Sequence, residues 1–183
     1  MARYVAFLKA INVGGHVVKM DRLRQLFEAE GLANVETFIA SGNVIFETKS
    51  GNTQALQKRI EDLLRKSLGY DVATFIRTDA EVANIAGYRP FVDSALKSAR
   101  ALNVAFLDGP LPGEAQKALM RLKTNVDDFH VHGREAYWLC RKKQSESAFS
   151  NAVFERTLKI QTTFRGFNTV VRLAAKYPPS PKA

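Results

Sequence analysis

A chain of 183 residues with 46% hydrophobic and 25% charged residues has an ordinary globular composition, which excludes extended disorder and a fibrous structure. Its apolar runs fall short of the roughly 18 residues that a membrane helix needs, and the N-terminus alternates like a strand and lacks the features of a signal peptide. The single cysteine, Cys140, excludes an internal disulfide and fits a reducing compartment. We therefore expect a cytoplasmic protein with no membrane partner.

The formal net charge of +9 is unevenly distributed along the chain. Residues 1–91 carry 12 Lys and Arg against 10 Asp and Glu, whereas residues 92–183 carry 15 against 8. Such a bias attracts nucleic acid or other polyanions, but an ordinary solvated surface has the same signature. Both interpretations stay open.

Apolar spacing in the first half predicts a β-α-β-β-α-β order. The first helix is marked by Met20, Leu23 and Leu26, which fall on one face, and Ser41-Gly42-Asn43 has the chemistry of a hairpin turn. The predicted elements are a strand over 3–11, a helix over 20–30, strands over 34–40 and 43–48, a helix over 53–68, a strand over 71–78 and a short helix over 79–86.

The second half repeats this order. Its predicted elements are a strand over 101–107, a helix over 114–123, a hairpin around Gly133-Arg134, a helix over 148–159, a strand over 161–165 and a last helix from Phe167. We expect an α+β protein with two ferredoxin-like βαββαβ halves in tandem, at 1–90 and 98–183, followed by a C-terminal helix.

Three polar connections are candidates for binding an anion. The glycine-rich loop before the first helix offers backbone N–H groups and a nearby lysine. The 41–43 turn and the start of the last helix add amide, hydroxyl and guanidinium groups. The candidate residues are Asn12, Gly14, Gly15, Lys19, Ser41, Asn43, Arg165, Asn168 and Thr169. Each has a plain structural alternative as a turn or helix-capping residue.

The hairpin around Gly133-Arg134 has a predictable register. Phe129 should face Trp138, and Asp127 should face Cys140, which turns the thiol toward the core. His130 and His132 then share the other face with Glu135, on an open hairpin end that makes a poor zinc site. We predict neither a metal site nor a cofactor, and no catalytic motif occurs, so an enzymatic role is left open.

The Arg141-Lys142-Lys143 run follows this hairpin. It is typical of a solvated strand end, and its functional interpretation is a patch that contacts phosphate.

Four motifs along the chain form a recognisable set: FLKAINVGG, KM-x-x-L, FIASGNVIF and the closing FNTVVRL. Together they resemble the bacterial family known as domain of unknown function 1697, from Tyr4 to about Ala175. Two departures are visible, because Lys9-Ala10 replaces the Arg-Gly of the family's first block and Gly166-Phe167 replaces the Asn-Trp of its last.

The resemblance implies a two-part α+β fold with ferredoxin-like halves, and it supplies no activity. The motif residues that match are small or polar and lie outside the apolar faces. They are Asn12, Gly14, Gly15, Ser41, Gly42, Asn43, Asn168 and Thr169. This strengthens the interest of the three polar connections, although glycine and asparagine also define turns.

The leading prediction is a site for a small anionic or nucleotide-like ligand centred on the 12–19 loop. We expect the 41–43 turn at the opposite end of the first sheet, which would divide the motif between two places. Two alternatives are nucleic-acid association through the basic C-terminal half and a non-catalytic interaction protein. The sequence leaves the oligomeric state open.

Overall fold

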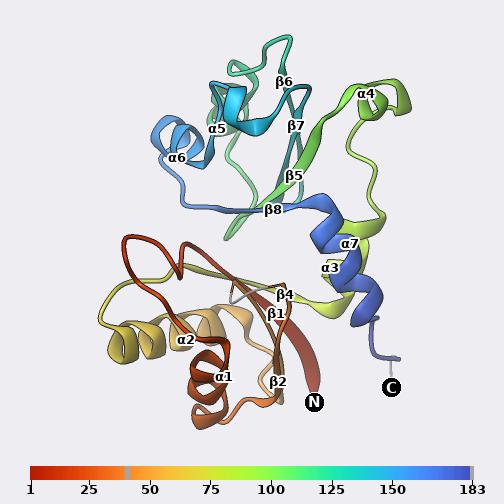
Figure 1. Ribbon diagram of the computed structural model, residues 1–183. Coiled ribbons are helices and arrows are strands. Elements are labelled where there is room, and N and C mark those ends of the chain that lie inside the picture. The colour runs from red at the N-terminus through yellow and green to blue at the C-terminus, as the bar shows by residue number, and fades with distance from the viewer. Residues whose placement is uncertain (40–41, 182–183) are drawn as a thin grey trace. The chain divides into compact units, whose positions relative to one another are not determined.

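The computed structural model describes residues 1–39 and 42–181 and shows a mixed α+β protein (Figure 1). The described part contains two four-stranded antiparallel sheets and seven α-helices. The chain divides into two compact units. The first unit joins Met1–Ala86 with the segment that begins at Val171, and the second is Gly87–Val170.

The first unit is built on a sheet with the strand order β2-β3-β1-β4. Its strands are β1 (Ala2–Leu8), β2 (Ala33–Thr37), β3 (Asn43–Thr48) and β4 (Thr74–Thr78). Strand β1 pairs antiparallel with both β3 and β4, and Phe7 of β1 lies opposite Asn43 of β3.

Helices α1 (Met20–Ala29) and α2 (Thr53–Leu68) lie on the same side of this sheet (Figure 1). Both bury residues at helical spacing, and burial of each large apolar side chain contributes roughly 1.5–3 kcal/mol. The buried positions are Leu23, Leu26 and Phe27 on α1, and Leu56, Ile60 and Leu64 on α2. Asn52 caps the start of α2 by accepting from the Ala55 N–H at 3.0 Å, and Gly69 ends it at a φ of 84°.

The last residues of the chain return to the first unit. Beyond α7 (Phe167–Lys176), the Tyr177 hydroxyl donates to Glu36 Oε2 at 2.5 Å, and Arg3 donates to the Pro178 carbonyl at 3.1 Å. The Ser180 N–H and hydroxyl both donate to Asp79 Oδ2, at 3.0 and 3.1 Å. This segment therefore completes the hydrogen bonding of β2 and of α3 (Asp79–Gly87).

The second unit contains the sheet with the order β6-β7-β5-β8. Its strands are β5 (Ala101–Phe106), β6 (Asp127–His132), β7 (Glu135–Cys140) and β8 (Thr163–Gly166). The predicted hairpin register is confirmed, because Phe129 pairs with Trp138 and Asp127 with Cys140. An aromatic core follows from it, with Phe149 packed against both Phe129 and Trp138 at ring distances of 4.6 and 4.9 Å.

Helices α5 (Gly113–Met120) and α6 (Asn151–Leu158) contribute Leu119, Phe154 and Leu158 to this core. Two short helices were not predicted, α4 (Asp93–Ser98) and the 3₁₀ turn η1 (Gln144–Glu146). Helix α4 buries none of its residues, so its sequence carries no apolar periodicity that would have revealed it.

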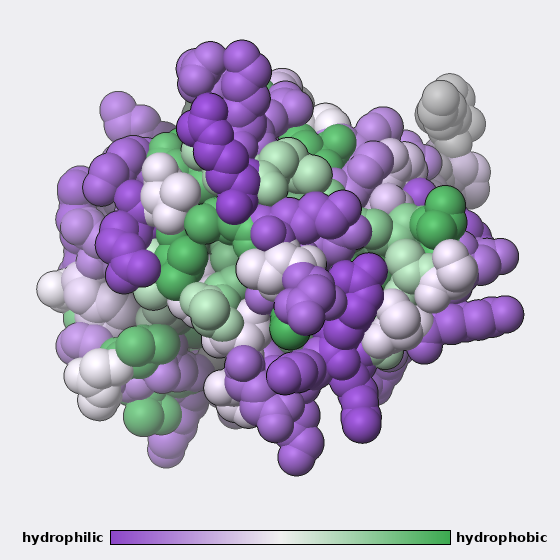
Figure 2. Space-filling view, turned by 90° about the horizontal axis from the view of Figure 1, so that it is seen from above, coloured by the Kyte–Doolittle hydropathy of each residue, from purple (hydrophilic) through white to green (hydrophobic). Residues whose placement is uncertain are grey.

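Hydrophilic residues cover most of the face seen in Figure 2, with hydrophobic residues in small groups between them. Within residues 1–39 and 42–181, no helix has both the length and the apolar character needed to cross a membrane.

Candidate anion-binding site

The loop between β1 and α1 is held by its own hydrogen bonds. The Asn12 side chain accepts from the Val18 N–H at 2.7 Å, which closes the loop upon itself. Tyr70 donates its hydroxyl to the Ile11 carbonyl at 2.7 Å and stacks on His16 with ring centroids 4.0 Å apart. Asn12 therefore has a structural role, and Lys19 extends from the loop as an exposed side chain.

The turn between β2 and β3 is stabilised by Asn43. This side chain is 2% exposed and donates to the carbonyls of Phe38 and Ile39, at 2.9 and 3.4 Å. Ser41, the other candidate in this turn, lies outside the described residues.

The expectation that this turn lies away from the 12–19 loop was wrong. The Leu8 N–H at the end of β1 donates to the Gly42 carbonyl at 2.8 Å, so the two connections begin at the same edge of the sheet. The physical reason is that α1 carries the chain back to the starting end of β1. Strand β2 then runs in the direction of β1, since both are antiparallel to β3.

Backbone strain accompanies these two connections. Ala10 has a φ of 52° and Ile39 a φ of 48°, a region that L-residues with a β-carbon rarely adopt. Gly14 and Gly15, with φ of 67° and 83°, adopt the same region without a steric cost. The positive φ of Ala10 also explains why β1 ends at Leu8, short of the predicted residue 11.

The third group of candidates lies in the second unit. Half-buried Arg165 of β8 donates to Thr163 Oγ1 at 2.7 Å and to the Phe164 carbonyl at 2.8 Å. Burial lowers the pKa of its guanidinium to about 10, so the group stays charged at neutral pH. Asn168 is exposed and Thr169 half-buried in the first turn of α7.

The two histidines pack around Tyr88. Tyr88 Oη lies 2.7 Å from His130 Nε2, and its ring stacks on His132 at 4.1 Å. Burial lowers the pKa of His130, with a smaller lowering from His132. Across residues 1–39 and 42–181, no cluster of three or more His, Cys, Asp or Glu side chains could hold a metal ion. Cys140 is fully buried, and burial raises the pKa of its thiol.

A hollow of about 730 Å³ lies at one end of the second sheet. Because β5 is antiparallel to both β7 and β8, its start meets their ends, and three chain segments converge there. We call this hollow the basic pocket; it is lined by Leu96, Ala99, Arg100, Ala101, Leu102, Asn103, Lys142, Lys143, Gln144, Gly166, Phe167 and Asn168.

The charge of the basic pocket has one sign. Arg100, Lys142 and Lys143 contribute three cations, and no carboxylate belongs to the lining. All three side chains are exposed, and none of them forms an ion pair with a described carboxylate. The first turn of α7 also borders the pocket through Phe167 and Asn168, and the N-terminal end of a helix favours negative charge.

Asn103 adds a buried amide to this lining. The side chain is 7% exposed, and its Nδ2 has no hydrogen-bond partner within the described part of the chain. An unsatisfied buried donor costs roughly 1–3 kcal/mol. In a folded protein such a group is expected to find an acceptor on a ligand or a water molecule.

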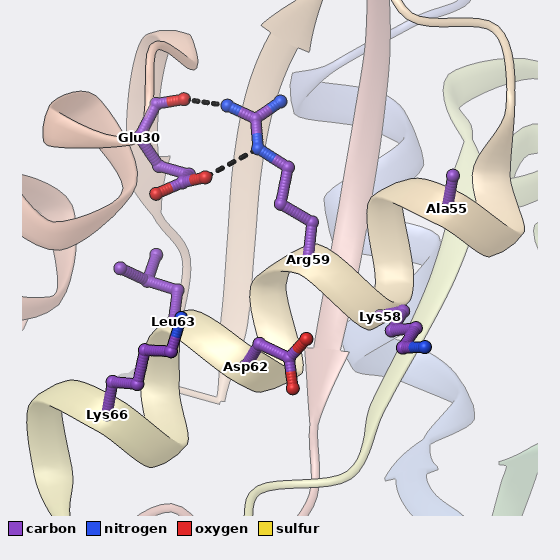
Figure 3. A pocket seen from close by; sticks show the side chains of 7 residues that line it. All are labelled: Glu30, Ala55, Lys58, Arg59, Asp62, Leu63 and Lys66. Carbon is purple, nitrogen blue, oxygen red and sulfur yellow. Dashed lines mark hydrogen bonds and ion pairs between the residues drawn. The ribbon is translucent and has the colours of Figure 1, made fainter.

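A second hollow of about 390 Å³ on α2 provides a contrast. It also presents Lys58 and Lys66, but Glu30 and Asp62 belong to its lining. Figure 3 shows Arg59 reaching from α2 to Glu30, with Nε 2.5 Å from Oε1. The charges of this hollow are mixed and partly neutralised, so the basic pocket is the better place for an anion.

Of the predicted site residues, only Asn168 lines the basic pocket. Arg100 and Asn103 were missed, although an asparagine within the apolar run ALNVAFL is a visible signal of a polar group on a core strand. Lys142 and Lys143 belong to the basic run whose phosphate-contacting interpretation the sequence had left open.

A family comparison places the chain. The family model described as a protein of unknown function, DUF1697, matches residues 1–137. The chain belongs to this family. The DUF1697 match covers the 12–19 loop and most of the second sheet up to Tyr137, and it carries no activity.

A solved structure supports the fold. It is that of the conserved bacterial protein SP0830 from Streptococcus pneumoniae, which is 20% identical to this DUF1697 chain with a TM-score of 0.72. The similarity covers 94% of this chain and 98% of the other. None of the curated proteins compared with the chain matches it.

Proposed function

We propose that the second unit of this DUF1697 protein binds a small phosphate-bearing anion in the basic pocket. The observation that carries the proposal is the lining itself, with three unpaired cations and no carboxylate. Phosphate oxygens accept charge-assisted hydrogen bonds from Lys and Arg, and these are about twice as strong as neutral ones. The N-terminal turn of α7 supports the same ligand charge.

The 12–19 loop is the second candidate for this function. It is favoured by the convergence of the two connections at one edge of the first sheet, where Gly14 and Gly15 face open space. It is the weaker candidate because the Asn12 and Asn43 side chains bind backbone groups of their own connections. Lys19 is the exposed cation through which this site would act.

Isothermal titration with inorganic pyrophosphate at constant ionic strength tests the proposal. We expect saturable binding to the wild type and a loss of at least about tenfold in affinity for the double variant K142A/K143A, since each charge-assisted bond is worth roughly 1.5–3 kcal/mol. The matched control is K58A/K66A, which removes two lysines from the hollow of mixed charge. Equal losses in both double variants, or no binding to the wild type, would reject the pocket.

Nucleic-acid association is a rival for the same cations. It predicts that affinity for a single-stranded oligonucleotide falls steeply with salt, since each phosphate contact releases counterions. Retention of the oligonucleotide without retention of pyrophosphate would favour this rival, and K142A/K143A would then lower the salt dependence by about two contacts.

The finer statements on fold and setting remain proposals. We interpret each sheet with its helices as ferredoxin-like, because the order β-α-β-β-α-β and the strand order β2-β3-β1-β4 have that topology. A division into domains at 1–90 and 98–183, a cytoplasmic location and a role as an interaction protein stay predictions. Limited proteolysis followed by mass spectrometry would test the domain boundary.

A further inference from the structure

The basic pocket is larger than an inorganic anion requires. Its volume of about 730 Å³ lies within the range of sites for drug-sized ligands, which is roughly 300–1,000 Å³. The cations account for three of its twelve lining residues. The rest of the lining must therefore contact a part of the ligand other than its phosphate.

Asn103 describes one property of that remaining part. Its buried Nδ2 offers two donors and finds no acceptor within the described residues. Asn43 of the first unit shows the contrasting case, because its equally buried amide donates to two carbonyls. The ligand is thus expected to present an acceptor to the inner end of the pocket.

The remaining lining is of two kinds. Gln144 and Asn168 are exposed amides, each with donors and an acceptor, and Leu96, Leu102 and Phe167 are half-buried apolar side chains. A nucleobase has apolar faces and an edge of alternating donors and acceptors, so it suits this mixture. A sugar phosphate has no apolar face to match.

We infer that the basic pocket takes a free nucleotide, with its phosphate on Arg100, Lys142 and Lys143 and an acceptor of its base toward Asn103. This inference rests on the proposed function, because it assigns the phosphate to the same cations.

Titration with AMP, GMP, CMP, UMP and ribose 5-phosphate tests it. We expect at least one nucleotide to bind about tenfold more tightly than ribose 5-phosphate, since a base adds at least one hydrogen bond and apolar contact. In Asn103→Leu, this ratio of affinities should fall toward one. Nucleotides and ribose 5-phosphate that bind equally would overturn the inference and leave the proposed function standing, whereas no binding by any of them would remove both.

A measurement on the wild type keeps the test independent of how Asn103→Leu folds. The side-chain NH₂ resonances of Asn103 should shift on addition of the best nucleotide in ¹⁵N-correlated NMR spectra, and those of Asn43 should not. Unmoved Asn103 resonances at saturation would overturn the inference. So would binding of an RNA decamer by a protein that ignores all four mononucleotides, because the ligand would then be a nucleic-acid chain.

Discussion

The polar connections of the first unit and the basic pocket of the second unit use similar residues in different ways. In the first unit, the amides of Asn12 and Asn43 bind backbone groups of their own connections. In the second unit, the amide of Asn103 has no protein acceptor, and three cations face a hollow without a carboxylate. A motif of asparagines and glycines can therefore mark a turn that must be held, while the groups left for a ligand lie elsewhere.

The largest expected effect separates the two buried asparagines. Asn43→Ala leaves the carbonyls of Phe38 and Ile39 without their donor, and we expect it to lower the free energy of unfolding by about 2 kcal/mol. Asn103→Leu removes a donor that has no partner, so its cost should stay below about 1 kcal/mol. Urea denaturation followed by circular dichroism measures both. A comparable loss in the two variants would show that Asn103 is satisfied in the ligand-free protein.

Asn12→Ala tests whether the glycine-rich loop is held or is free to bind. Loss of the 2.7 Å bond from the Val18 N–H should cost about 1 kcal/mol in the free energy of unfolding, with pyrophosphate affinity unchanged. Weakened pyrophosphate binding in a variant of wild-type stability would move the anion site to this loop.

The C-terminal segment predicts a pH dependence. Burial, and then the hydrogen bond to Glu36, raise the pKa of Tyr177 above its usual value of about 10. The contribution of this bond is complete below about pH 10 and is lost as the pH rises further, because the unfolded chain then releases the proton first. Tyr177→Phe should cost about 1 kcal/mol at neutral pH, since Glu36 is partly exposed. Its deficit relative to the wild type should narrow above pH 10, and a constant deficit in denaturation curves would contradict the assignment.

Ala10→Gly tests the strain at the end of β1. With a φ of 52°, alanine is in a region that costs it about 1–2 kcal/mol, and glycine adopts this region freely. Because glycine also loses more backbone entropy on folding, we expect a net stabilisation of about 0.5 kcal/mol. The thermal midpoint should rise, with Ala2→Gly in the exposed start of β1 as a control that should not raise it.

Lys19→Ala has the smallest expected effect. Its exposed side chain makes no ion pair with a described residue, so we expect less than about 0.5 kcal/mol in stability. Pyrophosphate affinity should stay that of the wild type. A tenfold loss of affinity here, next to none in K142A/K143A, would reverse the comparison of the two units.

Most of the secondary structure could be predicted because it depends on local spacing. The apolar faces of α1 and α2 follow from Leu23, Phe27, Ile60 and their neighbours, and the hairpin register follows from Gly133 alone setting the turn. Helix α4 was missed since none of its residues is buried, and β1 was drawn too long since a positive φ at an alanine has no sequence signal.

The sequence by itself determined the order of elements, the faces that become buried and membership in the DUF1697 family. Only the tertiary structure decided that Arg100, Asn103, Lys142 and Asn168 line one pocket. These residues come from three segments far apart along the chain, and the antiparallel pairing of β5 with both β7 and β8 brings the segments to one end of the sheet. Strand direction is a property of the assembled sheet, because it depends on how each helix returns the chain, and local spacing does not encode it.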